Sequence, residues 1–165
     1  LGGMDGGMIQ ASMRKGEKDW GLVGDITTIN PRVVNDILSK GYIPVVSGIA
    51  QAVDGDGIYN VNADTVAAEL AVALGAIKLI LLTDVRGVLG DATDEETLIS
   101  RIKLQDVHSL KEKGIITGGM LPKVECCVKA LQGGVERTHI IDGRIEHSIL
   151  IELLSDEGIG TMITA

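Results

Sequence analysis

The chain has 165 residues, of which 45% are hydrophobic and 22 are glycine, and its formal net charge is -8. Length and apolar content allow one domain with a substantial core. The acidic surplus argues against non-specific nucleic-acid binding, and neither an apolar run of membrane-spanning length nor a signal-peptide pattern occurs.

The first 24 residues are rich in glycine and charge. We expect residues 1–24 to form a connecting segment, a hairpin at the edge of the domain, with a short strand over Met8–Ala11. The chain begins at Leu1 within this stretch rather than at an initiating Met, which indicates a piece of a longer protein. Residues 25–165 would then form the main domain.

The next elements are predicted from local signals. Asn30 and Pro31 suit a helix start, and the apolar spacing that follows predicts a helix over Pro31–Lys40. The apolar, β-branched run Ile43–Ile49 predicts a strand. Turn residues fill Asp54–Gly57.

A polar segment precedes the second predicted helix, Thr65–Leu74. Asn60, Asn62 and Asp64 are spaced two apart, which in an extended segment sends their side chains to one face, where they could hold one ligand. Asn62 or Asp64 could instead cap the helix, because both residue types are favoured N-caps. The two interpretations are compatible.

Strands and helices alternate through the rest of the chain. The predicted elements are a strand at Lys78–Thr83, helices near Leu104–Lys113 and at Leu121–Leu131, a strand near Thr138–Ile141, a helix near Ile145–Leu154 and a strand near Thr161–Thr164. This alternation predicts an α/β fold with a largely parallel, buried sheet. In such sheets ligands bind at the carboxyl ends of strands, where Thr83–Leu89 lies. Neither a Walker string nor a G-x-G-x-x-G string occurs.

A glycine-rich turn precedes the Leu121–Leu131 helix. Gly118 and Gly119 allow close approach of the backbone to a ligand, and Pro122 suits a first helical turn. A helix start favours anions and Lys123 adds a positive charge, so phosphate is the natural ligand. Taken alone, the string fits an ordinary glycine-containing loop better. Cys126 and Cys127, adjacent on this helix, predict small buried side chains in a reducing compartment, with no disulfide and no metal site.

Four strings together resemble the acetylglutamate kinases of the amino acid kinase family. They are YNVNADT (59–65), LLTDVRGV (81–88), TGGMLPKV (117–124) and DEGIGT (156–161), in this order and at similar spacings. The resemblance runs from about Gly21 to the end. It implies the carboxyl-terminal, ATP-binding half of a three-layer αβα sandwich with a mainly parallel open sheet, similar to carbamate kinase.

The resemblance implies transfer of the γ-phosphoryl group of ATP to the side-chain carboxylate of N-acetyl-L-glutamate, in arginine biosynthesis in the cytoplasm or, after a transit peptide, in a plastid. Asn60 would contact the acetylglutamate with Asn62 nearby, Asp64 would orient catalytic lysines, and Lys123 would stabilise charge on the phosphoryl group. Mg²⁺ would be held mainly by the ATP phosphates, with no protein metal site. The nucleotide surface would comprise Thr83, Asp84, Val85, Gly87, Val88, Leu89, Ile116, Thr117, Gly118, Gly119 and Met120.

The carboxyl-terminal region resembles the part of arginine-inhibited members that binds arginine, through His147, Glu157, Gly158 and Gly160. His147 could equally be an ordinary polar helix residue. The full enzyme would be a homo-oligomer that a nitrogen-signalling regulator could contact.

The amino-terminal half of the family, which supplies another catalytic lysine, has no counterpart here. If these 165 residues are the whole polypeptide, we expect weak nucleotide binding and little or no kinase activity. Two alternatives remain: another amino acid kinase, acting on carbamate, aspartate, glutamate or a nucleotide, and a non-catalytic module that binds arginine or a regulator.

Overall fold

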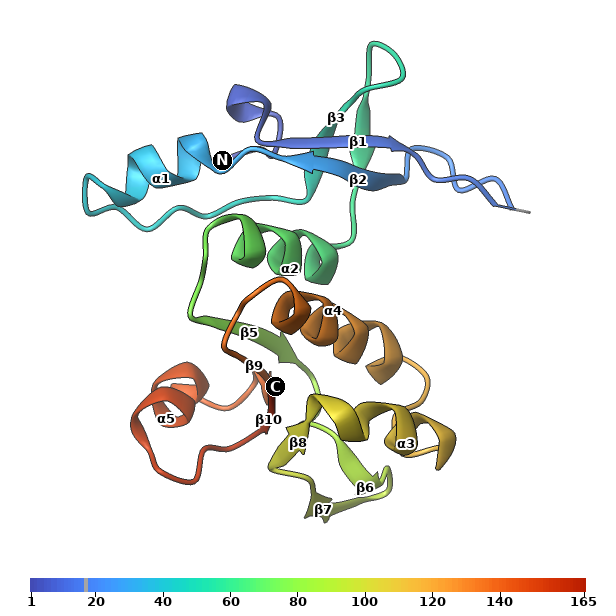
Figure 1. The fold of residues 1–165 in the computed structure, drawn as a ribbon, viewed down its shortest axis with the longest axis vertical. Helices are drawn as coiled ribbons and strands as arrows, with labels where there is room; N and C mark the ends of the chain where they lie inside the picture. The colour runs from blue at the N-terminus through green and yellow to red at the C-terminus, as the bar shows by residue number, and fades with distance from the viewer. Residues whose placement is uncertain (17) are drawn as a thin grey trace. The chain divides into compact units, whose positions relative to one another are not determined.

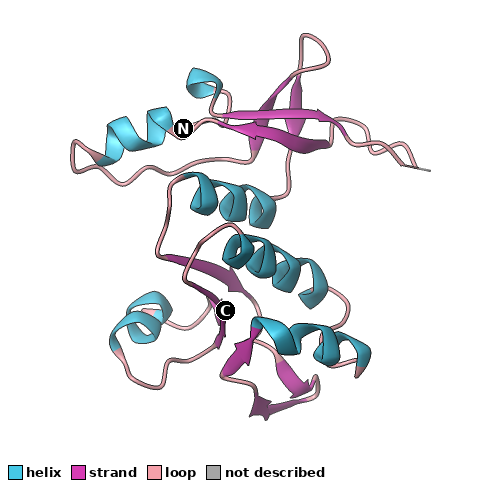
Figure 2. Ribbon diagram, viewed as in Figure 1, coloured by secondary structure: helices cyan, strands magenta, loops and turns pink. Residues whose placement is uncertain are grey.

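The computed structural model describes residues 1–16 and 18–165, which form two compact units, Leu1–Leu74 and Gly75–Ala165. Both units contain helices and strands (Figure 2). The division falls just after the second α-helix, so residues 1–24 belong to the same unit as the 50 residues that follow them.

The first unit is a four-stranded mixed sheet with two α-helices (Figure 1). Its elements are a 3-10 turn (Asp5–Gly7), β1 (Ile9–Met13), β2 (Gly24–Ile29), α1 (Arg32–Leu38), β3 (Ile49–Ala52), β4 (Ile58–Asn60) and α2 (Ala63–Ala73). The strand order is β2-β1-β3-β4, in which β1 and β3 are parallel and the other pairs antiparallel. Its core comprises Met8, Ile9, Ala11, Val34, Ala50, Ala52, Tyr59, Val61 and Val66.

Most local predictions for this unit are confirmed. The short strand expected near Met8–Ala11 is β1, which pairs antiparallel with β2, a strand that begins only at Gly24. In the sheet β1 lies between β2 and β3. Helix α1 (Arg32–Leu38) lies within the predicted span Pro31–Lys40, but its N-cap is Pro31 rather than Asn30. The Asn30 side chain still accepts a hydrogen bond from the Arg32 amide (3.2 Å).

The predicted strand over Ile43–Ile49 is wrong. Strand β3 begins only at Ile49, and Ile43 and Val45 are 90% and 78% exposed. A β-branched run becomes a strand only where a neighbour supplies backbone partners. Among the described residues, Leu1 supplies such partners to the later part of this segment: its ammonium group donates to the Val45 carbonyl, and its carbonyl accepts from the Ser47 amide.

The second unit holds a four-stranded sheet, a two-stranded hairpin and three α-helices. Its elements are β5 (Lys78–Thr83), β6 (Leu89–Asp91), β7 (Asp94–Leu98), β8 (Arg101–Lys103), a 3-10 turn (Leu104–Asp106), α3 (Val107–Glu112), α4 (Met120–Gln132), β9 (Arg137–Asp142), α5 (Ser148–Leu154) and β10 (Thr161–Thr164). The order is β5-β9-β10-β8, with β5 parallel to β9 and β8 parallel to β10. The strands β9 and β10 are antiparallel.

Helices cover both faces of this sheet. Helix α4 packs on β5, β9 and β10, whereas α5 packs on β9 from the other side (Figure 1). Val124, Cys127 and Ala130 of α4 are fully buried, as are Ile140 and Ile141 of β9. The predicted α/β class with parallel-rich sheets is thus confirmed.

Three further properties bear on function. Cys126 is half-buried and Cys127 is buried. No group of His, Cys, Asp and Glu side chains among the described residues has the arrangement of a metal site. None of the described helices combines the length and apolar content needed to cross a membrane.

Candidate active site

A cavity of about 300 Å³ opens in the second unit at the carboxyl end of β5. The segment after β5 and the turn that begins α4, which lie far apart in sequence, form most of its wall. The lining residues are Thr83, Asp84, Val85, Gly87, Val88, Leu89, Ala92, Ile115, Thr117, Gly119, Met120 and Lys123.

Most of the predicted nucleotide surface lies in this wall. Two predicted residues do not: Ile116 is buried in the core at 1% exposure, and Gly118 is not among the lining residues. Ala92 and Ile115 line the cavity without having been predicted. Ala92 sits between β6 and β7, a hairpin whose polar strands carry no apolar alternation, so the sequence held no signal for it.

The wall after β5 is held by backbone hydrogen bonds. Val88 is buried, its amide donates to the Thr161 hydroxyl (2.8 Å), and its carbonyl accepts from the Ile99 amide (2.9 Å). Gly87 has φ of 154°, and a Cβ there would lie 2.5 Å from Thr161 Oγ1. A glycine is therefore required for the chain to pass this close to β10.

The other wall is the beginning of α4. The helix starts at Met120, earlier than predicted, because the amides of Met120 and Leu121 bond the carbonyls of Thr117 and Gly118 (3.1 and 3.3 Å). Pro122 is therefore the third helical residue, within the first turn as predicted, where a missing N–H costs nothing. Lys123 lines the cavity from this turn, at the positive end of the helix dipole.

A carboxylate that the sequence did not single out lies at the end of the neighbouring strand. Asp142 pairs with Thr83 across β9 and β5 and is buried. It accepts two side-chain hydrogen bonds from Arg144 (2.9 and 2.7 Å) and one from the Arg144 amide (2.9 Å). These bonds, chiefly those from the Arg144 side chain, lower the pKa of Asp142 from 3.8 to about 2.

Replacing Arg144 with leucine should lower the free energy of unfolding at neutral pH but not near pH 2. A carboxylate with a lowered folded-state pKa stabilises the fold above its unfolded pKa, and this contribution disappears as pH falls from about 4 to about 2. We expect the free energy of unfolding of Arg144→Leu to be about 1 kcal/mol lower than that of the original chain at neutral pH. This difference should vanish near pH 2 in urea titrations.

The exposed Arg14–Asp25 pair (2.6 Å) in the first unit provides the control. Arg14→Leu should change the free energy of unfolding by less than about 0.5 kcal/mol. A difference between Arg144→Leu and the original chain that persists unchanged at pH 2 would contradict the assignment.

The Asn and Asp residues belong to the first unit. Asn60 ends β4, Asn62 is the N-cap of α2, and Asp64 lies in its first turn. The Asn62 side chain accepts from the Thr65 amide (3.0 Å), which confirms capping by Asn62. The expectation of one extended face is wrong, because the chain becomes helical at Ala63 and the period of two is lost.

The residues of the possible arginine site lie around α5. His147 precedes this helix in a left-handed conformation (φ 58°), which explains why α5 begins at Ser148 rather than at Ile145. Its exposed ring lies 3.4 Å from Glu146 Oε1. Glu157 and Gly158 line a cavity of about 160 Å³ beside His139 and Glu152, and His147 is not among its lining residues.

Gly160 lies between this cavity and β10. Its amide donates to Glu152 Oε2 (3.2 Å). A Cβ at this position would overlap the Ile140 carbonyl, so a larger residue would push the loop off β9.

Comparison with known proteins agrees with the fold and with the resemblance seen in the sequence. The sequence profile of the amino acid kinase family matches residues 5–142. The acetylglutamate kinase of Desulforamulus reducens is 50% identical over 167 residues, covering all of this chain and 58% of that protein. That of Heliobacterium modesticaldum is 53% identical over 173 residues, covering 99% and 58%.

The similarity extends to solved structures. N-acetylglutamate synthase from Neisseria gonorrhoeae, complexed with coenzyme A and L-arginine, superposes with a TM-score of 0.84 at 28% identity, covering 99% of this chain and 37% of that one. The chain spans about 58% of the length of the curated relatives it matches. The family match, covering most of the sequence, is decisive: the chain belongs to the amino acid kinase family.

Proposed function

We propose that this chain carries the ATP-binding part of an acetylglutamate kinase of arginine biosynthesis. The observation that carries the proposal is the cavity at the carboxyl end of β5, closed by the first turn of α4 with Lys123. The names of the relatives at about 50% identity supply the substrate, since the cavity itself does not distinguish among phosphoryl acceptors.

The cavity offers the two kinds of surface that a nucleotide needs, one apolar and one positively charged. Val85, Val88 and Leu89 offer apolar surface for a purine, while Lys123 and the start of α4 offer positive charge for phosphates. A volume of about 300 Å³ is at the lower end of ligand sites, which suits part of a nucleotide. Mg²⁺ would be held mainly by the phosphates, consistent with a wall that has one carboxylate, Asp84.

The chemistry requires positioning and charge neutralisation rather than a covalent protein group. The acceptor carboxylate is ionised near neutral pH, so no general base is needed. In this proposal Asn60 contacts the acetylglutamate with Asn62 nearby, and Asp64 orients catalytic lysine side chains. Lys123 stabilises the charge that develops on the transferring phosphoryl group.

Calorimetric titration of the chain with MgATP tests the nucleotide site. We expect saturable, weak binding, and the absence of binding by MgATP and MgADP would contradict the proposal. The acceptor is tested on a polypeptide of the relatives' full length that contains these residues. Hydroxylamine should trap the acyl phosphate of N-acetylglutamate as a hydroxamate, whereas the 165-residue chain alone should give little or none. Greater turnover with glutamate, aspartate or carbamate would assign another amino acid kinase.

Arginine binding at the loop between α5 and β10 is a second candidate. The synthase with a similar fold was solved with L-arginine, and the cavity at this loop is lined by Asp156 and Glu157, whose carboxylates suit a guanidinium group. The same cavity is lined by the cationic side chains of Lys78, Arg101 and Arg137, which suit a carboxylate group rather than a guanidinium group. We propose that Glu157, Gly158 and Gly160 form this site, with His147 at the start of α5. Binding of arginine without any binding of nucleotide would favour a sensor module over a kinase.

A further inference from the structure

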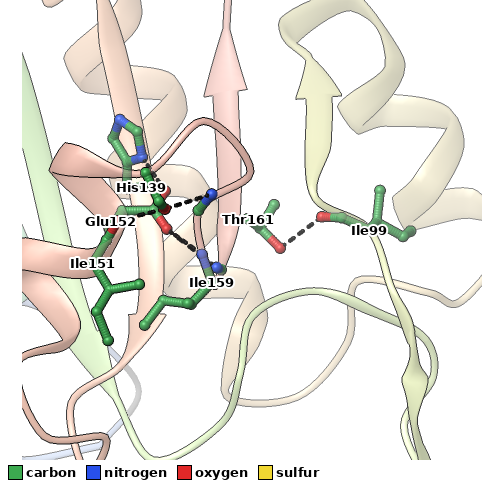
Figure 3. Close-up of polar contacts among 9 residues, drawn as sticks. Ile99, His139, Ile151, Glu152, Ile159 and Thr161 are labelled. Carbon is green, nitrogen blue, oxygen red and sulfur yellow. Dashed lines mark hydrogen bonds and ion pairs between the residues drawn. The ribbon is translucent and has the colours of Figure 1, made fainter.

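The hydroxyl of Thr161 joins three segments of the second unit. Thr161 begins β10 and is fully buried. Its Oγ1 donates to the Ile99 carbonyl (2.8 Å), as Figure 3 shows, and accepts from the Val88 amide (2.8 Å). A hydroxyl has one proton to donate, so Thr161 uses it on Ile99 and uses a lone pair on Val88.

This hydroxyl lies directly behind the wall of the candidate nucleotide cavity. Gly87, Val88 and Leu89 all line the cavity. The Val88 amide holds this segment to β10 by its hydrogen bond to the Thr161 hydroxyl. Gly87 lies so close to Thr161 that there is no room for a Cβ. A shift of the Thr161 hydroxyl therefore moves the wall itself.

The position of Thr161 is in turn set by a buried carboxylate. Glu152 of α5 accepts hydrogen bonds from the amides of Ile159 (2.7 Å) and Gly160 (3.2 Å), immediately before Thr161. His139 Nδ1 of β9 lies 2.7 Å from the other oxygen of Glu152 (Figure 3). The loop is thus fixed to the sheet just before the residue that holds the cavity wall.

We propose that Thr161 is a positioning residue for nucleotide binding, acting through the Val88 amide; this inference rests on the proposed nucleotide function. Thr161 is not among the residues that line the cavity. Its hydroxyl sets where Gly87 to Leu89 lie, and Glu152 sets where the hydroxyl lies.

The test compares Thr161→Val with Thr161→Ser and Thr138→Val. Valine keeps the shape of threonine but leaves the Val88 amide and the Ile99 carbonyl without their partner, whereas serine keeps both bonds. Thr138 is an equally buried threonine of β9 whose hydroxyl has no partner among the described residues, so its replacement by valine is the matched control.

Two measurements decide the outcome. Calorimetry with MgADP, below the unfolding temperature of every variant, should show at least about tenfold weaker binding for Thr161→Val and unchanged binding for the other two. Amide hydrogen exchange should be faster at Val88 in Thr161→Val alone, with Ile159 and Gly160 unchanged. Unchanged MgADP affinity in Thr161→Val would overturn the proposal. If the original chain binds no MgADP, the proposed function fails, and unchanged exchange at Val88 would separately overturn the positioning role.

Discussion

Replacing Glu152 with alanine should destabilise the second unit by about 3–5 kcal/mol, the largest stability change that we expect for a polar residue here. The carboxylate is 5% exposed and accepts from two backbone amides and from His139. Alanine removes the acceptor of all three donors, and each donor left without a partner in this part-buried site costs about 1–3 kcal/mol. Urea denaturation followed by circular dichroism measures the change.

The exposed Glu157, five residues further along, supplies the control. Glu157→Ala should change the free energy of unfolding by less than about 0.5 kcal/mol. Adding His139→Ala to Glu152→Ala should cost less than the sum of the two single changes, because the two side chains share one hydrogen bond. A loss below about 1 kcal/mol in Glu152→Ala would show that water replaces the carboxylate.

Short runs of apolar and β-branched residues were enough to locate two strands of the second unit to the residue. Lys78–Thr83 and Thr161–Thr164 are the observed bounds of β5 and β10. Both strands belong to a sheet that helices cover, so the apolar residues that favour a strand locally are also the ones that the fold buries. Helices α2 and α4 were also predicted to within two residues at each end, because capping and apolar spacing agree.

Elements whose form depends on distant partners were predicted poorly. The β6–β7 hairpin is polar and is stabilised by side-chain bonds such as Thr97 Oγ1 to the Asp94 carbonyl (2.6 Å), which no hydrophobic pattern reveals. Conversely, Ile43 and Val45 have strand-forming side chains yet remain exposed outside any strand. Strand pairing is a non-local property, and β-propensity reports mainly how well a side chain fits a surface that must already exist.

The candidate site also depends on contacts between residues distant in sequence, which the sequence alone did not predict. The resemblance located the segments that line the cavity, but it could not tell that Ile116 faces the core while Ile115 faces the cavity. The bond between Val88 and Thr161 joins residues 73 positions apart, and only the fold brings them together. The sequence thus identified the segments of the wall but not what holds them in place.

Replacing Lys123 with methionine should weaken MgATP binding by about 10- to 100-fold, which corresponds to the loss of one hydrogen bond to a charged group. Methionine keeps the length and apolar stem of lysine but removes the charge that lines the cavity at the first turn of α4. Adenosine has no phosphate, so its affinity should stay within about twofold of that of the original chain if Lys123 serves the phosphates alone. Competition with a fluorescent nucleotide measures both affinities.

Lys129, near the other end of α4, provides the matched control, since it is exposed and does not line the cavity. Lys129→Met removes the same charge from the same helix, so a general effect of net charge on nucleotide binding would appear in both variants. We expect it to change MgATP affinity by less than about twofold, because an exposed charge outside the cavity is screened by water and salt. Equal losses of MgATP and adenosine affinity in Lys123→Met would instead mean that Lys123 shapes the cavity and does not serve the phosphates.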